Sequence, residues 1–137
     1  MTYAGDVTPT EAYAAATGPE GALLVDVRTR AEWTYVGVPV LEAAGHDVAF
    51  VEWSTFPDGR VNEHFVDEVR AAGLAPGRPV YLICRSGVRS KAAADALTGA
   101  GLGPAFNVLE GFEGPHDAEG HRTLGGWKVA GLPWRQG

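Results

Sequence analysis

The most regular pattern in the chain is a series of short apolar runs, each bounded by glycine, proline or polar residues. In the run ALLVDV at 22–27 nearly every position is apolar, which is typical of a strand buried on both faces. Similar runs recur along the chain, and together they predict strands at 22–27, 47–52, 79–83 and 105–109.

Helical patterns separate these strands. Thr8-Pro9-Thr10-Glu11 fits a capping box with proline at the first helical position and predicts a short helix over 9–17. The other segments predict a helical turn over 30–35, a loop over 36–46, a turn at 56–59, a helix capped by Asn62 and ended by Gly73, and a helix over 90–100. Strands that alternate with helices predict a single α/β domain over 1–137. Its three layers are an open, mostly parallel sheet of four to five strands with helices on both faces.

Composition and charge narrow the class of protein. With 137 residues and 45% apolar content, the chain is long enough for one hydrophobic core. A net charge of −6 argues against a nucleic-acid-binding protein, and no apolar run approaches the roughly 20 residues that span a bilayer. The opening segment lacks the features of a signal peptide, and a single cysteine cannot form an internal disulfide. We therefore expect a cytoplasmic protein that binds neither nucleic acid nor membrane.

The single cysteine, Cys84, directly follows the strand predicted at 79–83 and begins the sequence CRSGVRS. Ligands of open α/β sheets collect beyond the carboxyl ends of the strands, and the start of the next helix offers unpaired N–H groups to an anion. Gly87 lets several N–H groups converge, while Arg85, Arg89 and Lys91 add positive charge with no acid between 84 and 94. These features favour the thiolate, which is the nucleophilic form, so Cys84 is predicted to be catalytic rather than a buried apolar residue.

The length of this loop distinguishes two kinds of thiolate chemistry. Cysteine phosphatases and related arsenate reductases need five residues between the cysteine and the arginine. Here four residues separate Cys84 from Arg89, and Ser90 stands where a phosphatase has its arginine. The shorter loop is better sized for one terminal sulfur on Cys84 than for a tetrahedral oxyanion. Sulfur chemistry is therefore favoured, with a phosphatase or arsenate reductase as the minor alternative.

Four segments together resemble a single-domain rhodanese, and they extend over nearly the whole chain: LLVDVRTRAEW at 23–33, PVYLICRSGVRS at 79–90, NVLEGFEG at 107–114 and GGWKVAGLPW at 125–134. The resemblance implies a rhodanese-like fold and a sulfurtransferase. Such an enzyme takes a sulfane sulfur from a small anionic donor such as thiosulfate, forms a persulfide, and passes the sulfur to a thiol or cyanide acceptor. The alternative is a persulfide carrier or sensing module that acts with a sulfur-relay partner protein and shows little free turnover. Neither a cofactor nor a metal is implied.

The resemblance also implies the members of the site. Cys84 would attack the donor, and the persulfide-binding loop would comprise Arg85, Ser86, Gly87, Val88, Arg89 and Ser90. The N–H groups of this loop would stabilise the sulfur, and Arg89, with Arg85, would attract the donor and stabilise departing sulfite. Ser90 is expected to act mainly as the helix cap. Asp26 and Arg28 follow the neighbouring strand and are expected to brace the loop, or alternatively Arg28 forms a surface pair with Glu32.

Other aromatic and histidine residues are given structural roles. Trp33, Trp53, Trp127 and Trp134 are expected to be packing residues, with Trp127 or Phe112 lining the pocket mouth as the alternative. The segment from His116 to His121 is expected to be a polar loop, because its spacing matches no established metal site. The chain departs from many rhodaneses at Gly37-Val38-Pro39-Val40, where those have Gly-His-Ile-Pro-Gly-Ala. The pocket wall over 36–60 is therefore not predicted.

Overall fold

A computed structural model of the protein describes residues 3–19, 21–42, 47–55, 59–114, 118–119 and 125–136. Five strands form one sheet in the order β1-β6-β5-β2-β4, and each neighbouring pair in it is parallel. These strands are β1 (Gly5–Val7), β2 (Leu23–Asp26), β4 (Ala49–Phe50), β5 (Pro76–Ile83) and β6 (Gly103–Val108). A separate antiparallel pair joins β3 (Val38–Pro39) to β7 (Trp134–Arg135).

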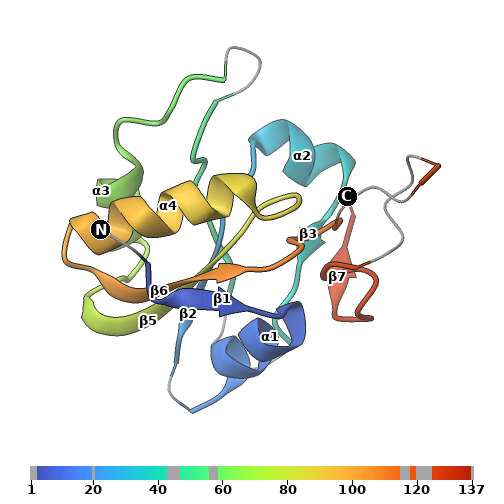
Figure 1. Cartoon of the computed structure of the whole chain (residues 1–137), viewed down its shortest axis with the longest axis horizontal. Coiled ribbons are helices and arrows are strands. Elements are labelled where there is room, and N and C mark those ends of the chain that lie inside the picture. The colour runs from blue at the N-terminus through green and yellow to red at the C-terminus, as the bar shows by residue number, and fades with distance from the viewer. Residues whose placement is uncertain are drawn as a thin grey trace.

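Helices cover both faces of the five-stranded sheet, as Figure 1 shows. The helix α1 (Pro9–Thr17) lies on one face, and α3 (Phe65–Ala71) and α4 (Val88–Gly99) lie on the other. The short α2 (Arg30–Tyr35) follows β2 and contributes no buried residue. The fold is therefore the expected three-layer α/β arrangement with a parallel sheet in the middle.

The hydrophobic core consists of two clusters, one on each face of the sheet. Residues alternate between them along each strand, so that Leu23 and Val25 pack toward α3 and α4 whereas Leu24 packs toward α1. All four residues of β2 are buried. This burial on both faces explains why the strand appears in the sequence as a nearly continuous apolar run.

Most elements lie where the sequence predicts them. The helix over 9–17 has the predicted capping box, in which Glu11 N–H donates to Thr8 Oγ1 at 3.1 Å. A second capping box begins α2 at Thr29. Its glutamate, Glu32, is also a residue of the candidate active site described below. The carboxyl ends of β2 and β5 lie side by side, because Asp26 is paired with Ile83. This register places Asp26 next to the strand end that leads into Cys84.

Two predictions about elements are wrong, one helix begins earlier than predicted, and one strand was not predicted. The helix predicted at 90–100 begins at Val88, with Gly87 as its N-cap, and Ser90 lies inside it. Asn62 does not cap α3: its Oδ1 accepts the N–H of His64 in a turn that precedes the helix. The loop expected over 36–46 contains β3, and β1 was not predicted at all. The predicted turn at 56–59 lies largely outside the described residues.

Within the described residues, no helix combines the length and apolar character needed to cross a membrane.

Candidate active site

Cys84 lies at the carboxyl end of the central strand β5, beneath the loop that connects the strand to α4. Its side chain is only 1% exposed, and its Sγ accepts the N–H of Gly87 at 3.1 Å. Gly87 has φ 109°, a conformation that residues with a Cβ rarely adopt. Gly87 therefore permits the left-handed turn that leads from the loop into α4, and it also supplies the amide that contacts the sulfur.

Ser90 contacts the sulfur from the first turn of α4. Its buried Oγ lies 3.2 Å from Cys84 Sγ and 2.5 Å from Asn107 Oδ1 on β6. The prediction that Ser90 caps the helix is wrong, because Gly87 occupies that position and makes no side-chain capping bond. The Ser90 oxygen thus contacts the thiol and the Asn107 amide rather than a backbone N–H.

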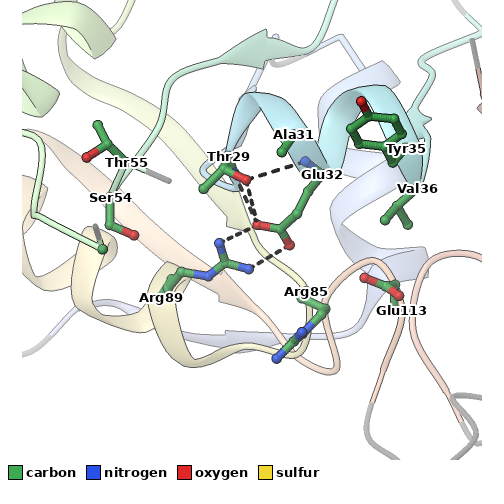
Figure 2. Close-up of a pocket in the computed structure, with 11 residues that line it drawn as sticks. Thr29, Ala31, Glu32, Tyr35, Val36, Ser54, Thr55, Arg85, Arg89 and Glu113 are labelled. Atoms are coloured by element: carbon green, nitrogen blue, oxygen red, sulfur yellow. Dashed lines mark hydrogen bonds and ion pairs between the residues drawn. The ribbon is translucent and has the colours of Figure 1, made fainter. Parts of the chain in front are cut away.

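Arg89 is not a free cation. Its Nη1 and Nη2 donate to Glu32 Oε1 and Oε2 at 2.6 and 2.8 Å, forming a bidentate pair across the pocket in Figure 2. Burial opposes the ionisation of Glu32, but the hydrogen bonds and charge of Arg89 outweigh it and lower the pKa of Glu32 from 4.5 to about 2. The same hydrogen bonds raise the pKa of Arg89. The expected attraction of anions by Arg89 is therefore largely compensated by a carboxylate 57 residues away.

Asp26 and Arg28 form a second ion pair, which is fully buried. Arg28 Nη2 donates to Asp26 Oδ2 at 2.7 Å and to the Gly37 carbonyl at 2.7 Å, and the guanidinium lies 4.3 Å from the centroid of the Phe112 ring. The alternative of a surface pair between Arg28 and Glu32 is wrong, because Arg28 is buried and Glu32 pairs with Arg89.

The loop that follows β6 holds the backbone of the cysteine loop. The N–H of Phe112 donates to the Cys84 carbonyl at 2.8 Å, and those of Glu113 and Gly114 donate to the Arg85 carbonyl at 3.0 and 3.2 Å. Since Arg28 packs on Phe112, the buried Asp26–Arg28 pair contacts the cysteine loop through that ring. The expected role of Asp26 and Arg28 in bracing the loop stays a prediction, and this contact is the route by which they would act.

A cavity of about 540 Å³ opens beside the cysteine loop (Figure 2). It lies between α2 and the two loops, and its lining includes Glu32, Tyr35, Arg85, Arg89 and Glu113. Cys84 itself is not among the lining residues, because the loop covers it. Arg85 is exposed, and among the described residues it has no ion-pair partner. The charged wall of the cavity thus combines one compensated arginine with one uncompensated arginine.

Sequence reasoning missed three residues of this site. Glu32 and Glu113 carry the negative charges of the cavity wall, and Asn107 supplies the hydrogen-bond partner of Ser90. Glu32 had a detectable signal, since Thr29-Arg30-Ala31-Glu32 fits a capping box, but that pattern indicates a helix start rather than a partner for Arg89. Asn107 interrupts an otherwise apolar strand, and an isolated polar residue in a buried strand is a signal for a hydrogen-bonded role.

Trp127, Trp53 and Trp33 pack against other residues as expected, whereas Trp134 is 40% exposed and contacts Phe112 edge-on. Trp127 is fully buried and donates its Nε1–H to the Pro133 carbonyl at 2.6 Å, and Trp53 packs edge-on against Phe65. Phe112 is also fully buried, so the alternative in which Trp127 or Phe112 lines the pocket mouth is wrong. His116 and His121 lie outside the described residues. Within the described ranges, no group of three histidine, cysteine or acidic residues is arranged to hold a metal ion.

Comparison with known proteins identifies the family to which this chain belongs. Residues 8–118 match the Rhodanese-like domain family. The chain belongs to this family, as its sequence resemblance implies.

Relatives align over almost the entire chain. An uncharacterized protein of Rickettsia conorii (RC0915) is 34% identical over 132 residues, covering 95% of this chain and 96% of the relative. The crystal structure of Rv0390 from M. tuberculosis is 52% identical, with a TM-score of 0.89 over 99% of this chain and all of that one. The solution structure of the 30 kDa polysulfide-sulfur transferase homodimer from Wolinella succinogenes has a TM-score of 0.64 at 20% identity, over 98% of this chain and 80% of that chain. The last similarity is one of fold.

Proposed function

We propose that the protein is a sulfurtransferase in which Cys84 carries the transferred sulfur as a persulfide. The observation that carries the proposal is the placement of the single thiol. Cys84 Sγ accepts the Gly87 N–H at 3.1 Å, within a loop that runs directly into the N-terminus of α4. Both the amide and the positive end of the helix dipole stabilise negative charge on sulfur, whether it is held by a thiolate or by a persulfide.

The reaction proceeds in two nucleophilic steps. The Cys84 thiolate attacks the outer sulfur of thiosulfate, a new S–S bond forms, and sulfite leaves with the electron pair of the broken S–S bond. A thiolate or cyanide then attacks the terminal sulfur of the persulfide, and the Cys84 thiolate is released. Arg85 is exposed at the cavity, so its charge is available to the anionic donor. Arg89 is held by Glu32 and is better suited to fixing α4 against α2 than to binding sulfite.

Intact-protein mass spectrometry tests the proposal directly. After incubation with thiosulfate we expect the mass to increase by one sulfur atom, and we expect cyanide to remove that sulfur and yield thiocyanate. Cys84→Ser should show no increase, and because the chain has no other cysteine, any sulfur that remains on this variant is not thiol-bound. The proposal fails if thiosulfate, inorganic polysulfide and an organic persulfide all leave the mass of the wild-type protein unchanged.

The burial of the thiol favours a second candidate, a persulfide carrier or sensing module that works with a partner protein. Cys84 is 1% exposed and does not line the cavity, so a donor reaches the sulfur only when the loop moves. A docked partner would supply such a movement. The two candidates differ in one measurement: a carrier would gain sulfur quickly from a partner cysteine desulfurase with its substrate, but slowly or not at all from free thiosulfate at millimolar concentration.

A further inference from the structure

A network of hydrogen bonds leads from the buried thiol to the protein surface. Cys84 Sγ lies 3.2 Å from Ser90 Oγ, and Ser90 Oγ lies 2.5 Å from Asn107 Oδ1. Asn107 Nδ2 in turn donates to Asp6 Oδ1 at 3.0 Å, and Tyr3 donates its hydroxyl to the same oxygen at 2.8 Å. Ser90 and Asn107 are 0% and 1% exposed, whereas Asp6 is at the surface. These four residues, Cys84, Ser90, Asn107 and Asp6, are called the thiol network below.

The carboxylate of Asp6 fixes the direction of every bond in this network. The hydrogen bonds from Asn107 and Tyr3 lower the pKa of Asp6, which is therefore ionised at neutral pH and acts only as an acceptor. Asn107 must present its NH₂ group to Asp6 and consequently its Oδ1 to Ser90. Because Oδ1 cannot donate, the single proton of the Ser90 hydroxyl lies toward Asn107.

The direction of the Ser90 proton determines which form of Cys84 the Ser90 oxygen can stabilise. With its own proton committed to Asn107, Ser90 offers only a lone pair to Cys84, which can accept a hydrogen bond from the S–H of a thiol. A Cys84 thiolate would instead face the Ser90 lone pair with no proton between the two atoms, so the contact would be repulsive. To stabilise the thiolate, the Ser90 hydroxyl must turn to Sγ, and the buried Oδ1 of Asn107 then loses its donor.

We propose that Asn107 and Asp6 are positioning residues that hold the proton of the Ser90 hydroxyl toward Asn107 and so oppose the ionisation of Cys84 in the resting protein. On ionisation the S–H bond breaks, the proton passes to solvent, and the Ser90 hydroxyl turns to the sulfur. The Gly87 N–H and the helix N-terminus favour this change, while the Ser90–Asn107 bond opposes it. The inference concerns the same thiol as the proposed function, but it rests on hydrogen bonds that exist whether or not sulfur is transferred.

Several charged groups surround the thiol and act on it at the same time. Arg89 of α4 interacts with it electrostatically but is paired with Glu32 of α2. At the end of β2 the buried Asp26 and Arg28 compensate one another, and the exposed Arg85 belongs to the loop itself. Lys91 of α4 lies near enough to Asp6 of β1 to lower the pKa of that carboxyl. These charges are the same in all the variants proposed below except Asp6→Asn. A difference in the ionisation of Cys84 among the other variants is therefore due to the direction of the Ser90 hydroxyl.

The test is the pH dependence of Cys84 alkylation by iodoacetamide, followed by intact mass. Asn107→Leu removes the acceptor of the Ser90 proton, so we expect the midpoint of the rate profile to move to lower pH by about one unit. In a Ser90→Ala background the Asn107→Leu change should have no effect, because Asn107 acts through the hydroxyl. Asn62→Leu is the matched control: Asn62 donates its Nδ2–H to the Glu52 carbonyl and to Glu68 Oε1 and is not part of the thiol network, so its replacement should leave the midpoint unchanged.

Asp6→Asn tests the same arrangement without altering the core. Without the carboxylate the Asn107 amide is free to turn its NH₂ group toward Ser90, so the midpoint should again fall, and this shift should disappear in the Ser90→Ala background. A purely electrostatic effect of the lost charge would persist there, as well as in the wild-type background. The inference is overturned if neither substitution lowers the midpoint, or if the shifts survive the removal of the Ser90 hydroxyl. Because alkylation needs no sulfur donor, this result is independent of whether thiosulfate loads Cys84.

Discussion

At the scale of single residues, the two arginines of the cavity wall differ: Arg89 is paired with a carboxylate, whereas Arg85 has no ion-pair partner among the described residues. Two arginines and two glutamates line the cavity, and Arg89 and Glu32 are joined by two short hydrogen bonds. From the sequence, Arg89 is indistinguishable from a free anion-binding group, because its partner lies on another helix 57 residues earlier. The pair connects α2 to α4 at the mouth of the cavity, which makes it a structural contact as well as an electrostatic one.

The Glu32–Arg89 pair should make stability depend on pH in a defined window. The pKa of Glu32 is lowered from 4.5 to about 2, so the folded protein holds the carboxylate more strongly than the unfolded chain does. The stabilisation is therefore fully present above pH 4.5 and is lost as the pH falls toward 2. Since both side chains retain more than a fifth of their exposure, we expect Glu32→Gln to lower the free energy of unfolding by only about 1 kcal/mol at pH 7.

Urea unfolding at a series of pH values measures this difference. The gap between wild type and Glu32→Gln should be constant from pH 7 to about pH 5 and should shrink below pH 4.5. Glu63→Gln, at an exposed position, serves as the control and should follow the wild type throughout. A gap that stays constant down to pH 3 would contradict the assignment of the effect to the carboxylate of Glu32.

At the scale of elements, the cysteine loop owes its shape to a second loop packed behind it. The segment 110–114 donates three backbone N–H groups to the carbonyls of Cys84 and Arg85, and Gly111 of this segment lies directly against them. A Cβ on Gly111 would lie 2.7 Å from the Arg85 carbonyl oxygen and would also collide with that of Cys84. Gly111 therefore allows the two loops to approach closely.

Two glycine substitutions separate the energetic cost of this close contact between the loops from the cost of backbone strain. Gly111 and Gly21 both have positive φ, 60° and 64°, but an added Cβ at Gly21 meets nothing within 4 Å. We expect Gly21→Ala to cost the backbone strain alone, about 1–2 kcal/mol in the free energy of unfolding. Gly111→Ala should cost about 1–3 kcal/mol more, because it also forces the cysteine loop aside.

Denaturant unfolding gives the two costs, and the alkylation profile of Cys84 shows where the distortion is. Gly111→Ala should alter the rate of alkylation at a fixed pH, whereas Gly21→Ala should not. Equal stability losses with unchanged alkylation in both variants would mean that the contact between the loops does not fix the sulfur.

The sequence predicts elements better than it predicts contacts between them. The buried strand β2 and the capped helix α1 follow from local patterns, namely an apolar run and a capping box. The strand β1 has three residues, Gly5–Val7, and contains a glycine and an aspartate, so it has no apolar pattern to detect. Ser90 resembles a helix cap by its chemistry, and only the true start of α4 at Val88 shows that it points to the thiol.

At the scale of the whole molecule, the net charge of the protein differs from the net charge of the cavity wall. The chain has a net charge of −6, while the two arginines and two glutamates that line the cavity cancel one another. A small anion that approaches Cys84 therefore meets the repulsion of the whole protein, and the unpaired charge of Arg85 is the main local attraction that opposes it. The basic appearance of CRSGVRS in the sequence does not reveal this balance, because Glu32 and Glu113 lie in other segments.

Alkylation of Cys84 by an anionic and a neutral reagent of similar shape tests whether the net negative charge of the protein or the arginines at the cavity dominate the approach of an anion. We expect the rate ratio of iodoacetate to iodoacetamide at Cys84 to rise about two- to threefold between about 10 mM and about 150 mM salt, as the screening length falls from about 30 to about 8 Å. Salt screens the repulsion of the anion and leaves the neutral reagent unaffected, so the ratio removes any change in the thiol itself. In Glu32→Gln, where the charge of Arg89 is no longer compensated, the ratio should be higher at low salt and should rise less. A wild-type ratio that falls with salt would show instead that Arg85 and Arg89 attract anions more strongly than the net charge repels them, and the cavity would then be a cationic site despite its glutamates.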